Sequence, residues 1–490
     1  MPLVRQLLTE DGNEKIIIFR NQRGAAQGCA NYLANDLTLH AAEEALGLLP
    51  DSDLSDASQG LRSALQGGTA FHTTNLNRDE KQIVERIFRD PSSPVRVLAA
   101  TTGVAAGINT PASTVIIAEQ EFIGEDNRPF TVAQYKNMAS RAGRKGYNER
   151  GKSIILAKTP AERERLFHTY VMGELESLSS SFDEADLGTW VLKLLVQVGP
   201  LKRNEVANLL ATTYGGFLRT RDSPDWLAEM YREVGDLLDH MTTLGIVEET
   251  DGLLHLTLLG QACGRSSFSL RSAMRLVELL KQQDPVVFSP LRLMAVLQAL
   301  PEADEIYTPM YKKGSREHTR SSEVQQRFGS NVARLLQRGA HDTFKWLARC
   351  KRAAILWDWV HGVDVAEIEH NFSPNPFQGV IRYGHIMGFS GTARYHLRSA
   401  AEILQVLVLD AALDPEDVDR LLVQLEEGLP SDALSLLKLP GELTRGEILN
   451  LYRQGVRSAE DVEKLDQDTL VMMIGHEKAK LVSKVPLSNP

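Results

Sequence analysis

Residues 95–153 of this chain read VRVLAATTGVAAGINTPASTVIIAEQEFIGEDNRPFTVAQYKNMASRAGRKGYNERGKS and hold its clearest structural signals. An apolar run at Val95–Ala100 predicts a buried strand, and a second run at Thr114–Ala118 predicts another. Arg141 and Arg144 follow on a predicted helix, three residues apart, so they share one helix face. Because ligands of open α/β sheets bind at the carboxyl ends of strands, we expect this arginine pair at that edge.

Two fixed guanidinium groups on one face suit a polyphosphate whose charge spreads during phosphoryl transfer. The alternative is a solvated basic turn, because cations are dense throughout this segment. Against one acid, Glu149, it carries Lys136, Arg141, Arg144, Lys145, Arg150 and Lys152. The residues alone leave both interpretations open.

Residues 1–160 alternate apolar strand runs with helical patterns. Continuous apolar strands between helices are typical of a parallel sheet that is covered on both faces. We therefore predict an α/β domain with strands at Lys15–Phe19, Gly68–His72, Val95–Ala100, Thr114–Ala118 and Ser153–Ala157.

Two stretches within this region resemble helicase motifs. The run ATTGVAAGINTPA is similar to motif V of superfamily 2 helicases, and QYKNMASRAGRKG is similar to motif VI. The resemblance is to the Ski-like DExH-box branch, whose motif VI reads Q-M-x-G-R-A-G-R. Here Asn137 replaces the glutamine and Ser140 the first glycine, whereas the run Arg-Ala-Gly-Arg is intact. The run KIIIFRNQRGAA also resembles motif IV.

The resemblance implies that residues 1–160 form the second RecA-like domain of a helicase. It implies that Arg141 and Arg144 stabilise charge on the phosphoryl group that ATP transfers. The other implied contacts are to the nucleotide, from Gly107 and Asn109, and to the nucleic-acid backbone, from His72 and Thr101.

Residues 119–131 (EQEFIGEDNRPFT) interrupt the α/β pattern. The run Gly124–Asn127 favours a tight turn, so the segment predicts a β-hairpin. Ski-like helicases place a strand-separating hairpin between motifs V and VI, which makes Phe122 a candidate wedge. An ordinary surface hairpin explains the same residues.

Two short matches to nucleotide motifs are rejected. Residues Gly146–Ser153 fit G-x-x-x-x-G-K-S, but a phosphate-binding loop needs a strand before it and a helix after it. Here a helix precedes the match and a strand-like run follows. Asp183–Asp186 spells DEAD but precedes a helical pattern, which favours a helix cap at Asp183.

The chain therefore shows no credible Walker A loop and no DExH box. The resemblance implies that ATP and Mg are held mainly by a first RecA-like domain, either a missing N-terminal part or a separate subunit. Alone, this chain is not expected to hydrolyse ATP.

The remaining sequence reads as mostly helical. Residues 187–264 predict a winged helix, whose third helix is too acidic to favour DNA reading, so a structural brace is expected. Residues 265–428 resemble the ratchet domain of Ski-like helicases. There, an arginine and an aromatic seven residues apart contact the strand, and the candidates are Arg382 and Phe389.

Residues 429–490 resemble a pair of helix-hairpin-helix units. The resemblance implies that hairpin amides and nearby cations hold a backbone phosphate without reading sequence, with Lys438 and Gly441 as candidates. A small protein-binding helical cap is the alternative, because the unit is acidic.

The composition of the chain limits the kinds of nucleic-acid contact, cellular location and cysteine role that we expect. The formal net charge is −10, so any nucleic-acid contact must come from local basic surfaces. No long apolar stretch and no signal peptide is visible, which predicts a cytoplasmic protein without a membrane segment. The widely spaced Cys29, Cys263 and Cys350 suggest neither a metal site nor disulfides.

Taken together, the sequence predicts the C-terminal half of an ATP-dependent nucleic-acid helicase with 3′-to-5′ polarity by resemblance. Its substrate would be single-stranded or forked, with DNA favoured but RNA left open. The alternative is a non-catalytic nucleic-acid-binding or scaffold subunit derived from such a helicase.

Overall fold

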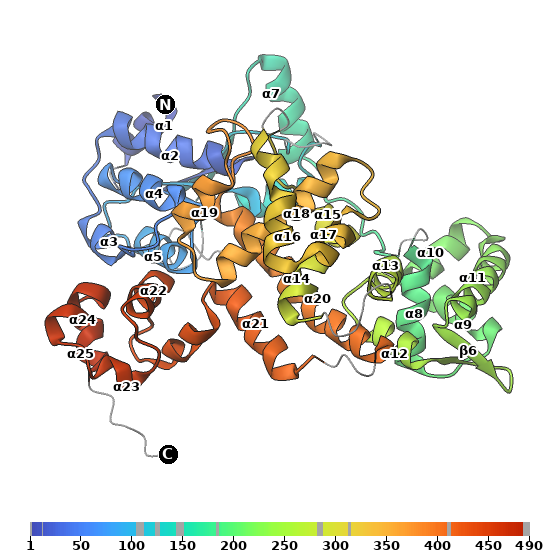
Figure 1. Ribbon diagram of the computed structural model, residues 1–490. Coiled ribbons are helices and arrows are strands. Elements are labelled where there is room, and N and C mark those ends of the chain that lie inside the picture. Colours follow the sequence, from blue (N-terminus) through green and yellow to red (C-terminus); the bar gives the residue numbers. More distant parts are fainter. Residues whose placement is uncertain are drawn as a thin grey trace.

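The computed structural model describes residues 2–11, 13–103, 112–122, 128–143, 151–182, 186–281, 288–311, 315–408 and 413–483. Three clusters of buried apolar side chains organise this part of the chain. The first runs from Val4 to Tyr170, the second from Leu187 to Leu425, and the third from Leu429 to Val482. Figure 1 shows the backbone that carries them as an α/β part from blue to teal, a large helical part from green to orange, and a small red C-terminal unit.

The first cluster is built around a five-stranded parallel sheet. Its strands lie in the order β2-β3-β1-β4-β5, so β1 is central. All residues of β2 and β4 and the first four of β1 and β3 are buried, because helices cover both faces. The strands are β1 (Ile16–Arg20), β2 (Thr69–His72), β3 (Val97–Thr101), β4 (Thr114–Ile117) and β5 (Lys152–Ile155). The predicted parallel α/β fold is confirmed.

The helices of the α/β part begin where the sequence supplies caps. Helix α5 starts at a reciprocal cap. The side chain of Asn77 accepts a hydrogen bond from the amide of Glu80, and the carboxylate of Glu80 accepts one from the amide of Asn77. Thr131 and Gln134 make the same reciprocal cap before α6. The helices are α1 (Pro2–Glu10), α2 (Arg23–Leu37), α3 (Glu43–Leu48), α4 (Asp56–Gln66), α5 (Arg78–Arg89) and α6 (Val132–Ala139).

A connection leads from the sheet to the second cluster. It contains α7 (Pro160–Leu166) and a π-helical turn at Phe167–Val171. The first elements of the second cluster are α8 (Leu187–Val198), α9 (Arg203–Thr212), α10 (Tyr214–Asp222), α11 (Trp226–Thr243), β6 (Val247–Thr250) and β7 (Leu253–Leu256). The last two pair antiparallel around Asp251 and Gly252, both with positive φ, which closes a tight hairpin.

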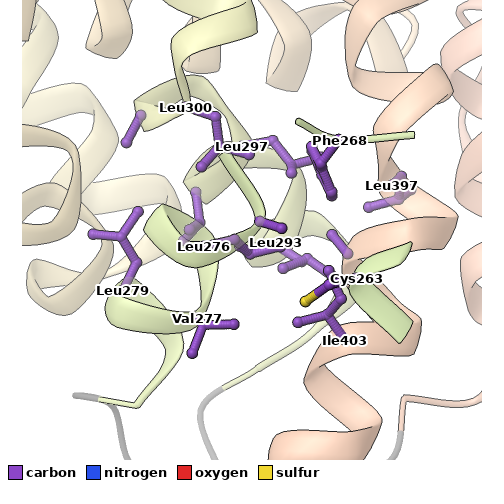
Figure 2. Packing of buried hydrophobic residues seen from close by; sticks show 14 of the residues in the cluster. Cys263, Phe268, Leu276, Val277, Leu279, Leu293, Leu297, Leu300, Leu397 and Ile403 are labelled. Atoms are coloured by element: carbon purple, nitrogen blue, oxygen red, sulfur yellow. The ribbon is translucent and has the colours of Figure 1, made fainter. Parts of the chain in front are cut away.

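Helices α12 (Leu258–Arg265) and α13 (Leu270–Leu280) carry the core across the predicted boundary at residues 264–265. Figure 2 shows Cys263 and Phe268 packed with Leu276 and with Leu397 and Ile403 of the long helix α20. The later helices are α14 (Pro290–Val296), α15 (Pro301–Asp304), α16 (Arg320–Phe328), α17 (Ser330–Gln337), α18 (Thr343–Val360), α19 (Val365–Asn371), α20 (Tyr383–Leu407) and α21 (Pro415–Glu427). One continuous core therefore serves α8 to α21.

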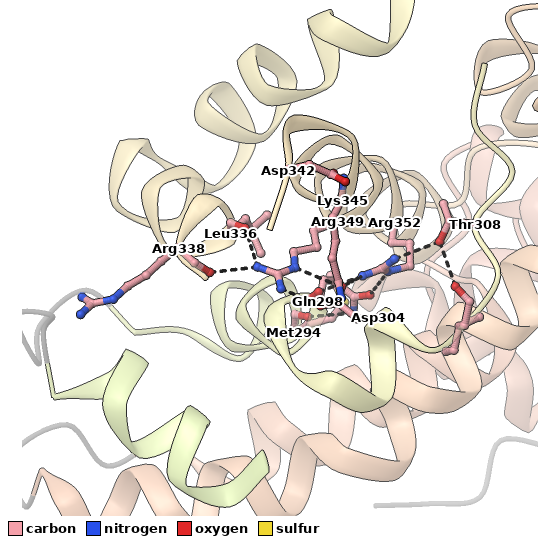
Figure 3. A network of polar contacts seen from close by, with 11 residues as sticks. Met294, Gln298, Asp304, Thr308, Leu336, Arg338, Asp342, Lys345, Arg349 and Arg352 are labelled. Atoms are coloured by element: carbon pink, nitrogen blue, oxygen red, sulfur yellow. Dashed lines mark hydrogen bonds and ion pairs between the residues drawn. The ribbon is translucent and has the colours of Figure 1, made fainter. Parts of the chain in front are cut away.

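Helix α18 is unusual because it buries cations as well as apolar side chains. Arg349, Lys351 and Arg352 are each at most 3% exposed. Arg349 and Arg352 both contact the carboxylate of Asp304, as Figure 3 shows. Such groups are tolerated inside a protein only when they are paired and hydrogen-bonded.

The C-terminal unit consists of a 3₁₀ segment and four short helices. These are Ser431–Lys438, α22 (Arg445–Arg453), α23 (Ala459–Val462), α24 (Gln467–Ile474) and α25 (His476–Val482). In Figure 1 it lies beside α3 and α5 of the α/β part. Within the described residues, no helix combines the length and apolar character needed to cross a bilayer.

Candidate functional site

A polar groove of about 810 Å³ lies where the α/β part meets the helical part. One wall follows the carboxyl ends of β1 and β2, with Asn21–Arg23 after β1 and Asn75 after β2. The opposite wall comes from the start of α20 and from Ile306–Tyr307. The groove therefore occupies the edge of the sheet where ligands of open α/β folds bind.

Arg23 gives this groove an unneutralised charge. Its side chain has no carboxylate or hydrogen-bond partner among the described residues, and burial lowers its pKa. The second cation, Arg382, forms an ion pair at 3.4 Å with Asp56, the one acid among the described residues that line the groove. Helix α2 also begins here without a side-chain cap and without an acid in its first turn. Open amides and an unpaired guanidinium both favour an anionic ligand.

Two amide side chains in the groove lack partners of their own. The Oδ1 atoms of Asn31 and Asn75 are buried and accept no hydrogen bond from any described residue. Asn75 is only 5% exposed, so bulk water does not fully solvate it. Buried polar atoms are nearly always satisfied, which indicates that a ligand or an ordered water completes this site.

Glycines keep the groove open. A Cβ atom at Gly24, Gly28 or Gly388 would meet no atom within 4 Å, so each leaves empty space beside bare backbone. Gly384 is different, because a Cβ there would lie 2.5 Å from Asn75 Oδ1 and 2.9 Å from the carbonyl oxygen of Thr74. Gly384 therefore lets α20 approach the sheet edge closely.

Of the residues predicted to contact the nucleic-acid backbone, His72 is not accessible. It ends β2, but it is 6% exposed, and its Nε2 contacts Glu85 at 3.0 Å. Burial lowers its pKa, and Glu85 only partly opposes this. Thr101 ends β3 opposite Arg20 and is half-buried at the same sheet edge. A role for Thr101 stays a prediction, whereas His72 would need a rearrangement to reach a strand.

Arg141 lies at the other edge of the sheet, which corrects the expectation that it sits at the carboxyl ends. Its carbonyl accepts a hydrogen bond from the amide of Ala112, just before β4. The amide of Gly143 donates to the carbonyl of Ala112. Arg141 is 8% exposed, so it is embedded beside the amino ends of β4 and β5. Arg144, Gly107 and Asn109 lie outside the described residues.

The structure also bears on the rejected phosphate loop. Lys152 starts β5, which pairs with β4, so a strand and not a helix follows the match. The backbone of Ala142 and Gly143 lies so close to Gly151 that a Cβ would meet it at 2.3 Å. Among the described residues of the match, 151–153, none begins a helix that could face a phosphate. Asp183 lies outside the described residues.

The predicted hairpin has an antiparallel bridge between Glu121 and Pro129 at its base. Phe122 lies at this base and not at the tip. Its ring packs edge-on against Phe130 at 4.7 Å between centroids, and the guanidinium of Arg128 lies 4.9 Å from it. The tip, residues 123–127, lies outside the described part, so the wedge role stays a prediction.

Phe389 is wrong as the stacking aromatic of α20. Its ring is fully buried in the second cluster, and Arg382 precedes the helix as its extended N-cap residue. The two side chains therefore do not share a helix face. The exposed aromatic on α20 is Tyr395, with 69% of its surface accessible, which sequence reasoning missed. The buried stripe Ile386, Phe389, Ala393, Leu397, Ala400 and Leu404 was the available signal.

Comparison with known proteins agrees with this architecture. No family model matches the chain. A curated relative, the ATP-dependent DNA helicase Hel308 of Pyrococcus horikoshii, is 27% identical over 464 residues, which cover 91% of this chain and 60% of the relative. The matched region is the C-terminal part of that helicase. This chain is similar to the C-terminal region of a Ski-like helicase. The predicted resemblance is confirmed, and the chain spans about three fifths of the relative it matches.

The structure of the C-terminal unit bears only in part on the predicted helix-hairpin-helix. Gly441 has φ +100 and a Cβ there would lie 3.6 Å from Lys478, which brackets a tight turn before α22. Lys438 is exposed at the end of the 3₁₀ segment. Thr444 and Glu447 already cap α22, and Lys478 pairs with Glu447 at 2.6 Å. Phosphate binding by Lys438 and Gly441 therefore stays a prediction.

Sequence reasoning counted Arg445 only among the cations near the predicted helix-hairpin-helix and missed its place at a junction. Its guanidinium pairs with Asp53 of the α/β part, lies 4.2 Å from the ring centre of Trp359, and donates to the carbonyls of Gly428 and Val363. One side chain thus contacts all three structural parts. No motif marks this residue, because its partners are distant in sequence.

Proposed function

We propose that this chain is the second half of an ATP-dependent DNA helicase motor, and that the groove holds the single strand. The observation that carries this is the position of the groove at the carboxyl edge of the sheet, with the unpaired Arg23 and the uncapped start of α2. The match to a helicase along 91% of the chain supports it.

The charge pattern of the groove suits a strand held by its backbone. The lining has amide side chains and two arginines against a single acid, Asp56. The chain as a whole carries a net charge of −10, so attraction to phosphate must be local. Contacts of this kind bind any sequence, which a translocating motor requires.

In this proposal the nucleotide binds at the opposite edge of the sheet. Arg141 beside the amino ends of β4 and β5, with Arg144, would stabilise the phosphoryl group of an ATP. The ATP and its Mg would be held mainly by a first RecA-like domain. Residues 187–264 would be a winged-helix brace, residues 265–428 the ratchet-like domain and residues 429–490 a helix-hairpin-helix unit. Tyr395 replaces Phe389 as the aromatic that α20 offers to a strand.

The direct test is the affinity of the 490-residue chain for a fluorescein-labelled oligothymidylate, measured by anisotropy at several salt concentrations. Arg23→Gln should weaken binding several-fold and reduce the slope of log affinity against log salt by about 0.7, the value for one single-strand phosphate contact. Arg221→Gln, an exposed cation at the far end of α10, is the matched control. Equal losses in both variants would remove the groove from the proposal.

One observation favours the alternative of a non-catalytic subunit. Arg141 is nearly buried within its own domain, where a finger would need to reach a neighbouring one. The discriminating measurement is ATP hydrolysis by the motor reconstituted with a first RecA-like domain. Arg144→Ala should abolish turnover while leaving strand binding intact. Turnover that is unchanged by this substitution would favour the scaffold.

A further inference from the structure

The groove contains one large exposed aromatic side chain. Tyr307 is 75% exposed and lines the groove opposite the carboxyl ends of the strands. Its nearest aromatic neighbour is the imidazole of His385, with ring centres 6.3 Å apart and planes inclined at 59°. The two rings are therefore not stacked on each other, and the tyrosine ring keeps much of its surface free.

Buried cations fix the backbone on one side of Tyr307. Arg352 donates from Nη1 to Thr308 Oγ1 at 2.9 Å, and Lys351 donates from Nζ to the carbonyl of Pro309 at 2.7 Å. These donors come from α18 and are at most 2% exposed. Thr308 and Pro309 immediately follow the tyrosine, so its Cα has little freedom on that side.

The same network holds the other side. Arg349 and Arg352 share the carboxylate of Asp304, with Nη2–Oδ distances of 2.6 and 3.1 Å (Figure 3). Asp304 ends α15, and the amide of Ile306 bonds back to Ala303 at 3.3 Å. Burying three cations costs solvation free energy that apolar side chains would not. Together, these contacts hold the backbone rigidly on both sides of Tyr307.

An exposed aromatic ring on a fixed segment is well suited to stacking. Little conformational entropy is lost when a base packs on it, because the backbone is already ordered. The groove beside it is open, since a Cβ at Gly24 or Gly28 on the facing wall, or at Gly388 on the same wall, would touch nothing within 4 Å. Arg23 and Arg382 supply cations to the same groove.

We propose that Tyr307 is a stacking platform for one base of a single strand whose backbone follows Arg23 and Arg382. This rests on the proposed function and adds a specific residue to it. Stacking needs only the face of a base, so the contact would bind every base type. Helix α20 would supply the glycine-lined part of the wall beside this ring, with Gly384 and Gly388, and not the ring itself.

The test compares two fluorescent probes of equal length, an oligothymidylate and an oligonucleotide of abasic sites. Tyr307→Ala should weaken thymidylate binding about ten-fold, within the range measured for one stacked base, and leave abasic binding unchanged. Tyr307→Phe should bind both probes like the unmodified chain. Tyr214→Ala, which removes an exposed tyrosine from α10, is the control and should change neither.

The outcomes separate the two proposals. If the unmodified chain binds neither probe, both the strand-binding groove and the stacking platform are overturned. If it binds both probes but Tyr307→Ala loses nothing on thymidylate, or loses equally on the abasic probe, only the stacking platform fails. A circular dichroism spectrum of each variant confirms that the helices remain folded.

Discussion

Arg445 forms a buried ion pair with Asp53, although 392 residues separate them in the sequence. The pair is 12% and 7% exposed, and Asp53 also accepts from the amide of Val365 at 2.8 Å. Trp359 lies under the guanidinium at 4.2 Å. This one side chain of the C-terminal unit thus contacts both larger parts of the molecule.

Removing this pair should destabilise the attachment. Arg445→Met leaves the buried carboxylate of Asp53 without its cation, which typically costs about 3 kcal/mol. Arg453→Met is the control, because the Arg453–Asp364 pair is 45% and 37% exposed and is expected to contribute less than about 1 kcal/mol. Denaturant unfolding followed by circular dichroism measures both. Equal destabilisation by the two substitutions would contradict the role of the junction.

Two glycines of α20 should respond oppositely to alanine. Gly388→Ala adds a methyl group to open space and should stabilise the chain by about 0.5–1 kcal/mol through helix propensity. Gly384→Ala should destabilise it, because the methyl group would meet Asn75 Oδ1 at 2.5 Å. Thermal unfolding of the two variants checks this. A stabilised Gly384→Ala would show that α20 does not approach the sheet edge as described.

The parallel α/β fold was predictable because apolar strand runs and capping residues are local signals. The position of Arg141 could also have been predicted from the sequence. A chain that connects parallel strands must return to their amino ends before the next strand begins. The groove was not, because Arg23, Asn75, Tyr307 and Arg382 meet only through tertiary packing. Phe389 was predicted to stack on a base because the resemblance places an aromatic seven residues after an arginine. Its place in the apolar stripe of α20 predicted a core residue instead.

The buried pair Lys351–Glu317 offers a double-mutant test of the network on α18. Lys351→Met leaves Glu317, which is 4% exposed, buried and charged, and should cost roughly 3–5 kcal/mol. Adding Glu317→Gln removes the stranded charge while still accepting from the amide of Tyr311. The double variant should therefore recover a large part of the loss. Additive losses in urea unfolding would mean that the two groups do not interact.

His385 should make stability depend on pH. Burial, helped by Arg23 and Arg382, lowers the pKa of His385 to about 4 from the usual 6.5. Between these values the unfolded chain binds a proton that the folded chain does not, so the free energy of unfolding falls as pH falls. From pH 7 to pH 5 the loss from this group is about 2 kcal/mol.

The variant His385→Asn isolates this contribution. Its Oδ1 can replace the ring Nδ1 that accepts from the amide of Arg382 at 3.0 Å, and it does not titrate. Its stability should therefore change less between pH 7 and pH 5 than that of the unmodified chain. The same pH dependence in both would assign the effect to other histidines, such as His72 and His396, whose pKa values burial also lowers.

The Asp53–Arg445 contact has a consequence for biosynthesis. A ribosome adds about 5–20 residues per second, so the aspartate waits roughly 20–80 s for its partner to be translated. During that interval the carboxylate is solvated and the surface that later meets the C-terminal unit is open to chaperones and proteases. A prematurely terminated product would keep that surface open permanently, which gives cellular quality control a way to distinguish it from the finished chain.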